Sequence, residues 1–178
     1  LDASTLPFEE NIANTKKVVE LAKQYGVTVE AELGLVGGSE DGSCDHGIRC
    51  TDPDDAKVFA KETGIDALAV AIGNAHGNYP VAPTLAFDVL ERIHENVDIP
   101  LVLHGGSGIP DDQLKAAFCT GISKFNVGTE FFLLNRSLTC RFYTEEVEKA
   151  KPFADVEYIR AGLTDYVEQK LSLCRLVV

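Results

Sequence analysis

The feature that most constrains the fold is a regular alternation between short apolar runs and longer amphipathic segments. The stretches at 66–72 and 99–104 (IPLVLH) are continuous apolar runs, which is typical of strands buried on both faces. A segment with helical periodicity follows each run, at 84–97 and 109–121. Such alternation, at about one strand and one helix per thirty residues, predicts a parallel sheet with helical crossovers.

Further segments extend this pattern along the chain. The sequence predicts strands at VTVEAELG (27–34) and SKFNV (123–127), the latter also buried, and helices at 11–25, 52–63, 130–149 and 156–173. Four strands, with a stub at Leu1–Ser4, are about half of what a (β/α)8 barrel of about 250 residues requires. We therefore expect an α/β fold, the C-terminal half to two-thirds of a TIM barrel. Residues 1–178 would form one partial domain (about strands 4–8), and a doubly wound sheet is the alternative.

Charge and cysteine content narrow the range of partners. The chain has 178 residues and a net charge of −12, which argues against nucleic acid or an anionic membrane surface as a partner. It shows neither a signal-peptide pattern nor an apolar run that could span a bilayer. Its five cysteines are scattered, so we expect reduced thiols in a cytoplasmic protein. A small metal site at Cys44, His46 and Cys50 is an alternative that no CxxC motif supports.

Polar side chains gather where the predicted strands end. They are Glu32, His76, His104 and Asn126. In a barrel, the carboxyl ends of the strands form the active-site rim. A single histidine there is more often a hydrogen-bonded rim residue, but two beside glycines favour a zinc or similar divalent ion. A catalytic zinc usually has three protein ligands, and His46 in its polar loop is a candidate for the third. His94 lies on a surface-type helix and is expected to be solvated.

Two glycine-containing loops predict a phosphate site. GGSG at 105–108 follows a predicted strand, NVGT at 126–129 spans the end of another, and each leads into a helix. Backbone N–H groups of such loops, with a helix N-terminus behind them, bind anions. GGSG alone is a common turn, but two adjacent loops of this kind form the usual phosphate site of a barrel.

Acidic residues offer two further candidates. Glu40 lies in GLVGGSEDG, where flanking glycines favour a mobile loop that carries a catalytic base; a solvated acidic loop is the alternative. Glu30 and Glu32 alternate with apolar residues on a predicted strand. We expect one of the two to point inward, where a carboxylate needs a cation or a hydrogen-bond donor.

Taken together, these residues resemble the class II, zinc-dependent ketose-bisphosphate aldolases, the fructose- and tagatose-bisphosphate aldolase family. The stretches that carry the resemblance are LDASTLPFEENI, VEAELGLVGGSEDG, TDPDDAKVFAKETGIDALAVAIGNAHG, IPLVLHGGSG and KFNVGTE. They run from Leu1 to about Thr129 and are highly specific in combination. The resemblance implies a (β/α)8 barrel, a dimer or tetramer, and reversible cleavage of a ketose 1,6-bisphosphate to dihydroxyacetone phosphate and glyceraldehyde 3-phosphate.

The resemblance also implies roles for individual residues. His76 and His104 match two of the three ligands of the catalytic Zn²⁺, and Asp2 and Glu32 match carboxylates that hold a second divalent ion in some members. Glu40 matches the loop glutamate that acts as general base at the carbon next to the carbonyl. The implied dihydroxyacetone-phosphate site, with a monovalent cation (Na⁺ or K⁺) nearby, comprises Gly77, Gly105, Gly106, Ser107, Asn126, Val127, Gly128 and Thr129.

The chain departs from the family pattern in two places. The motif with the first zinc histidine and the neighbouring catalytic aspartate lies upstream of Leu1, so we expect the chain alone to be an incomplete aldolase. YIRAGLTDYV (158–167) resembles the tagatose-bisphosphate branch, and Leu163 stands where many fructose-bisphosphate members carry an arginine for the distal phosphate. The alternative is a non-catalytic half-barrel, either a fragment or an accessory subunit, that retains a phosphate pocket.

Overall fold

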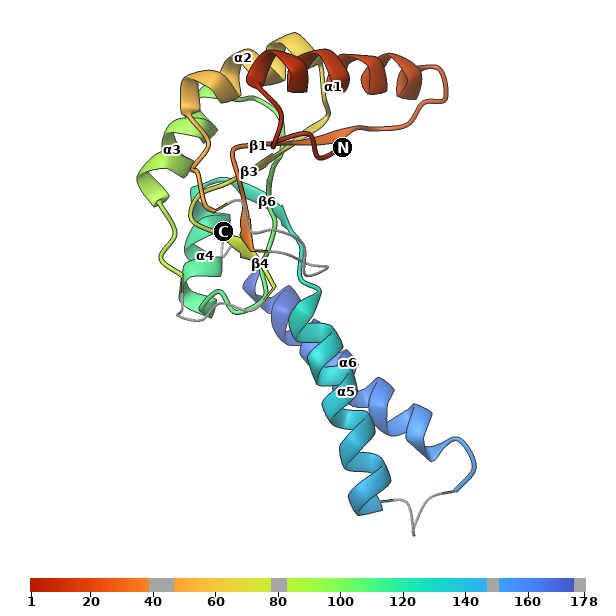
Figure 1. Cartoon of the computed structure of the whole chain (residues 1–178). Helices are drawn as coiled ribbons and strands as arrows, with labels where there is room; N and C mark the ends of the chain where they lie inside the picture. The colour runs from red at the N-terminus through yellow and green to blue at the C-terminus, as the bar shows by residue number, and fades with distance from the viewer. Residues whose placement is uncertain (39–46, 78–82, 147–150, 175–178) are drawn as a thin grey trace.

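The computed structural model describes residues 1–38, 47–77, 83–146 and 151–174. Within these ranges, helices and strands alternate along the chain (Figure 1). The elements are α1 (Phe8–Lys23), β1 (Glu30–Leu33), β2 (Gly37–Gly38), α2 (Pro53–Thr63), β3 (Ala67–Val70), β4 (Ala75–His76), α3 (Phe87–Asn96), β5 (Leu101–Leu103), α4 (Asp111–Thr120), β6 (Ile122–Phe125), α5 (Thr129–Arg141), the π-helical turn η1 (Phe142–Glu146) and α6 (Ala154–Leu173).

The central feature is a parallel sheet in the order β1-β3-β5-β6. Each strand pairs with the next strand of this order in parallel, and a helix connects them, as the alternation predicted. A second, two-stranded parallel pair joins β2 to β4 near the ends of β1 and β3. Helices α1, α2, α3 and α4 pack against one another in sequence order along one face of the sheet (Figure 1).

The hydrophobic core lies between the sheet and these helices. Ala31 and Leu33 of β1 are buried in this core together with the alternate residues of β3 and β5. Side chains two apart on a strand point to the same face. Glu30 and Glu32 therefore both point to the opposite, concave face, and the expectation that only one of them points inward was wrong. The core thus directs the polar residues of β1 away from the helices.

Helix α2 shows how local sequence sets an element's bounds. The Asp52 side chain accepts hydrogen bonds from the backbone N–H groups of Asp54 and Asp55, and Pro53 occupies the first turn. Gly64 ends the helix with a left-handed φ of 66°. The predicted helix at 52–63 is therefore confirmed almost to the residue.

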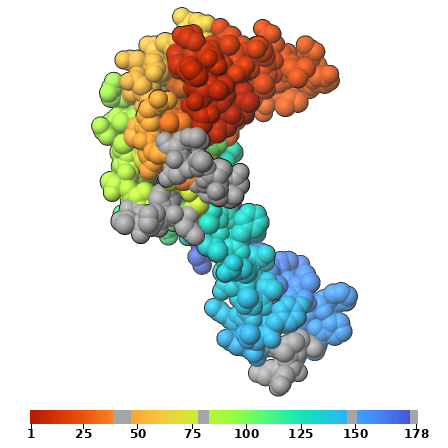
Figure 2. Space-filling model, in the orientation of Figure 1, coloured from red at the N-terminus to blue at the C-terminus, as the bar shows by residue number. Residues whose placement is uncertain are grey.

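The α5–α6 pair forms an arm that extends away from the sheet (Figures 1 and 2). The predicted helix at 130–149 instead ends its α-helical part at Arg141 and continues as η1. Helix α6 runs back along α5 towards α4. The Tyr166 hydroxyl on α6 donates a hydrogen bond to Glu130 Oε2 in the first turn of α5 at 2.8 Å. Phe132 and Phe153 are exposed on this arm.

Two strand predictions differ from the structure. Ser123 and Lys124 of β6 are exposed, so the prediction of a buried strand there was wrong: among the described strands, β6 pairs with β5 alone. Leu1–Ser4 forms no strand, although the Leu1 amine donates to the Glu30 carbonyl oxygen at 2.7 Å and so lies beside β1.

Two expectations from composition can be compared with the described residues. Cys50, Cys119, Cys140 and Cys174 form no disulfide within the described residues. Among these described parts of the chain, no helix combines the length and apolar character that crossing a membrane demands.

Candidate functional site

Three side chains that could hold a metal ion meet at the concave face of the sheet. Glu32 comes from β1, His76 from β4, and His104 directly follows β5. One ligand atom from each lies within 4.8 Å of the others. The Glu32 Oε2 atom is 2.9 Å from His104 Nδ1, and the two imidazole centroids are 5.9 Å apart. The sequence prediction that the two histidines converge at one edge is therefore met in the structure.

His104 is held on both sides of its ring. Its Nδ1 faces Glu32, and its Nε2 lies 3.0 Å from Glu30 Oε1. The hydrogen bond with Glu32 raises the pKa of His104 above its ordinary value of 6.5, burial works against this, and the contact with Glu30 adds to the rise. The metal-free site thus favours an imidazolium between two carboxylates.

Glu30 has a second partner, Lys124, whose Nζ atom is 2.8 Å from Glu30 Oε2. Burial works to raise the pKa of Glu30, but the hydrogen bonds from Lys124 and His104 outweigh it and hold the pKa below its ordinary value of 4.5. Charged groups of both signs therefore alternate across this face.

This cluster predicts a pH dependence of stability for the metal-free chain. A raised His104 pKa adds stability that is complete below pH 6.5 and is lost as the pH rises through the folded-state value. A lowered Glu30 pKa adds stability that is present above pH 4.5 and is lost below it. Urea midpoints measured with a chelator present should therefore be highest between these two values. His104→Gln should flatten the alkaline side, and an unchanged alkaline loss in that variant would contradict the assignment.

Two buried polar residues that sequence reasoning missed fix the backbone around the histidines. Asn74 is fully buried; its Oδ1 accepts from Ile72 N at 2.7 Å and its Nδ2 donates to the His104 carbonyl oxygen at 3.0 Å. Thr51 links the ends of β1 and β3, because its hydroxyl donates to Leu33 O and accepts from Ala71 N. The one available signal was an asparagine inside the otherwise apolar run before His76.

A small cavity of about 140 Å³ adjoins the metal-ligand group. It is lined by His76 with Gly77, Gly105, Ser107 and the run Asn126–Thr129. Apart from His76, these are residues that the family resemblance implies for the phosphate site, and of that implied set only Gly106 is missing from the lining. His76 belongs both to this cavity and to the metal-ligand group, so the two candidate subsites share a side chain.

Close backbone contacts shape the cavity. Gly105 has a φ of 62°, and a Cβ added there would lie 2.0 Å from the Ala75 carbonyl oxygen, so only glycine fits. Gly106 does not line the cavity, but its N–H donates to Asn126 O at 2.8 Å and ties the two loops together. The Ser107 hydroxyl oxygen accepts from the Glu130 N–H at 3.1 Å, which brings the first turn of α5 to the loop. The cavity therefore has the loops and helix N-terminus of an anion site.

Other predicted residues lie elsewhere. The Asp2 carboxylate accepts a hydrogen bond from Ser4 N at 2.9 Å and is not part of the metal-ligand group found among the described residues. His94 is exposed on α3, as expected. Glu40, Cys44 and His46 lie outside the described residues.

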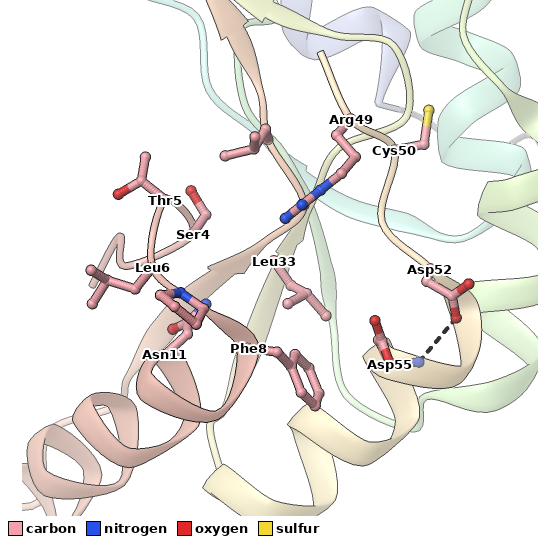
Figure 3. Close-up of a pocket in the computed structure, with 13 residues that line it drawn as sticks. Ser4, Thr5, Leu6, Phe8, Asn11, Leu33, Arg49, Cys50, Asp52 and Asp55 are labelled. Atoms are coloured by element: carbon pink, nitrogen blue, oxygen red, sulfur yellow. Dashed lines mark hydrogen bonds between the residues drawn. The ribbon is translucent and has the colours of Figure 1, made fainter. Parts of the chain in front are cut away.

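A larger cavity of about 450 Å³ lies between the start of α1, the end of β1 and the segment before α2 (Figure 3). Arg49 and Cys50 line it, together with Asp52 and Asp55 at the start of α2. Its lining includes Cys50 of the alternative metal site but contains no histidine and none of the residues predicted for the zinc and phosphate sites. We therefore place the candidate site at the smaller cavity, where the imidazoles and the glycine loops meet.

The chain is similar to known proteins over most of its length. The sequence profile of the class-II fructose-bisphosphate aldolases matches residues 1–177. The D-tagatose-1,6-bisphosphate aldolase subunit GatY of Klebsiella oxytoca is 40% identical over 98% of this chain and 62% of its own length. The fructose-bisphosphate aldolase of Geobacillus stearothermophilus is 51% identical over 73% of this chain and 45% of its own length.

A solved structure extends the comparison to the fold. The YdjI aldolase from Escherichia coli K12 superposes with a TM-score of 0.81 at 37% identity, covering 97% of this chain and 58% of that one. The chain thus spans about half to three-fifths of the length of such relatives, in agreement with a partial barrel. Because the family profile matches residues 1–177, nearly the whole sequence, the chain belongs to the class II fructose-bisphosphate aldolase family.

Proposed function

We propose that the chain supplies the catalytic face of a zinc-dependent aldolase that reversibly cleaves a ketose 1,6-bisphosphate, of the fructose or tagatose type. The products would be dihydroxyacetone phosphate and glyceraldehyde 3-phosphate. The observation that carries the proposal is the position of His76, which belongs to both the metal-ligand group and the glycine-lined cavity. A substrate whose phosphate occupies the cavity would present its adjacent carbonyl and hydroxyl oxygens to the metal.

The donor set fits zinc. Two imidazoles and one carboxylate are a ligand set of catalytic zinc, which leaves further positions open for substrate. Glu32 is nearly fully buried, and a buried carboxylate needs a paired cation, which is the His104 imidazolium in the metal-free chain and would be the ion in the loaded chain. In this proposal His76 and His104 hold the catalytic ion, and Glu32 adds the third donor found among the described residues. Asp2 and Glu32 remain the proposed carboxylates for a second ion. When bound, zinc supplies Lewis-acid polarisation of the substrate oxygens.

The remaining roles fall to the loops. Backbone N–H groups of Ser107 and of Val127–Thr129, backed by the N-terminus of α5, would hold the phosphate and so fix the reacting carbon. Gly105, Gly106 and Asn126 would shape this cradle, since the N–H groups of Gly106 and Asn126 donate to Asn126 O and Leu103 O. Gly77 would close the cavity beside His76. In the condensation direction Glu40 would take the proton from the carbon next to the carbonyl, and in cleavage it would return that proton.

The test is the zinc content of the purified chain after dialysis, paired with binding of dihydroxyacetone phosphate. We expect about one zinc ion per folded chain, the stoichiometry of a mononuclear site. We also expect dihydroxyacetone phosphate to bind more tightly to the zinc-loaded chain than to the chelated chain. A folded chain that binds dihydroxyacetone phosphate but retains no zinc would instead favour a non-catalytic half-barrel.

A further inference from the structure

The Glu30 carboxylate uses both of its oxygens at the concave face. Oε1 lies 3.0 Å from His104 Nε2, and Oε2 lies 2.8 Å from Lys124 Nζ. Glu30 is on β1 and Lys124 on β6, the two outer strands of the order β1-β3-β5-β6. This ion pair therefore spans the concave face across the two inner strands.

An irregularity in β6 accompanies this contact. The register between β5 and β6 shifts so that Leu101 stands beside Ile122 but Val102 stands beside Lys124, with Ser123 as the extra residue. A bulge of this kind redirects the side chains that follow it. Here it places Lys124 in register with Val102, which in turn pairs with Ala69, the partner of Glu32. The register shift thus places Lys124 at the same level across the sheet as Glu32 of the metal-ligand group.

The two ring nitrogens of His104 face different partners. Nδ1 is 2.9 Å from Glu32, a member of the metal-ligand group, whereas Nε2 faces Glu30, which is not in the group. A metal-binding imidazole must be unprotonated at the nitrogen that binds the ion. Because Nδ1 is the nitrogen on the side of the group, Nε2 must carry the proton.

We propose that Glu30, anchored by Lys124, is a positioning residue for the metal site. It accepts the Nε2–H bond of His104 and so fixes both the tautomer and the orientation of the ring, with Nδ1 directed at the ion. This inference rests on the proposed zinc site and assigns to Glu30 no contact with metal or substrate.

Lys124 decides which oxygen of the Glu30 carboxylate faces His104. It occupies Glu30 Oε2 and leaves Oε1 for the imidazole. Its positive charge also offsets that of Glu30, so Glu30 competes less with Glu32 for a cation. Loss of Lys124 should therefore weaken metal binding in the same direction as loss of Glu30, but less, since the Nε2 contact itself survives.

Two measurements test the inference. The first is zinc affinity, measured by competition with a chromophoric chelator, and the second is the visible spectrum of the Co²⁺-loaded chain. Glu30→Gln keeps the side-chain size but loses the charge, and we expect zinc affinity to fall by about 10–100-fold. Lys124→Met should lower affinity less. Both variants should shift the Co²⁺ absorption bands, which a merely structural role would leave in place.

The exposed pair Lys16–Glu62, with an N–O distance of 2.7 Å between α1 and α2, provides the matched control. Glu62→Gln makes the same chemical change away from the site and should alter neither affinity nor spectrum. Zinc binding and spectra unchanged in Glu30→Gln and Lys124→Met would overturn the inference while leaving the zinc site intact. Failure of the unsubstituted chain to bind zinc would overturn both. Should Glu30→Gln not fold, as judged by circular dichroism, the half-exposed Lys124 decides through its own variant.

Discussion

Replacing His104 with glutamine is expected to remove zinc from the chain. Glutamine keeps much of the side-chain volume and its hydrogen-bonding capacity, but it cannot supply an imidazole nitrogen to the ion. His104 is one of only three ligand-class side chains in the group found within the described residues. We expect zinc affinity to fall by more than about 100-fold, because losing only a hydrogen-bonding partner of a metal ligand already costs about 10–100-fold.

The measurement is zinc per folded chain after dialysis against a chelator of known affinity. His94→Gln is the control, because it makes the same change from histidine to glutamine at an exposed position on α3. Fold is checked separately, because His104→Gln also leaves Glu30 and Glu32 without their shared cationic partner. If His104→Gln folds and keeps zinc with the affinity of the unsubstituted chain, the proposed metal site is wrong.

How far the sequence predicts this molecule depends on the range of the interactions that set each feature. Helix α2 could be placed closely because Asp52, Pro53 and Gly64 act within a few residues of one another. Helix α1 begins at Phe8 rather than at residue 11. The ring of Phe8 packs 6.3 Å from that of Phe59 on α2, and such a contact has no local signature. Helix ends that are set by capping residues can therefore be predicted from the sequence more closely than helix ends that are set by packing.

The candidate site shows the same division. The strand-end rule together with the glycine spacing predicted that His76, His104 and the two loops meet at one edge, and the cavity is lined by His76 and by residues of both loops. The rule says nothing of side-chain partners. The contacts of Glu30 with His104 and Lys124 join residues 74 and 94 positions apart and depend on sheet curvature and on the register shift of β6. Local patterns carry no information on either.

Gly105→Ala is expected to damage both halves of the candidate site. Gly105 has a φ of 62°, and a left-handed backbone at a residue with a Cβ costs about 1–3 kcal/mol. The added Cβ would also lie 2.0 Å from the Ala75 carbonyl oxygen and 3.2 Å from His76 N. These are backbone atoms, so β4 or the loop must move, which adds about 1–3 kcal/mol of overpacking.

Such a movement would displace the loop N–H groups of the cavity and the backbone of His76 together. Gly26→Ala separates the two causes, because Gly26 has a φ of 65° but nothing within 4 Å of an added Cβ. Urea unfolding should show a loss of stability in both variants, larger in Gly105→Ala. Calorimetric titration should show loss of dihydroxyacetone-phosphate binding and weaker zinc binding in Gly105→Ala alone. Equal binding in the two variants would mean that the close approach of the Gly105 loop to β4 does not shape the site, and the phosphate cradle would have to lie elsewhere.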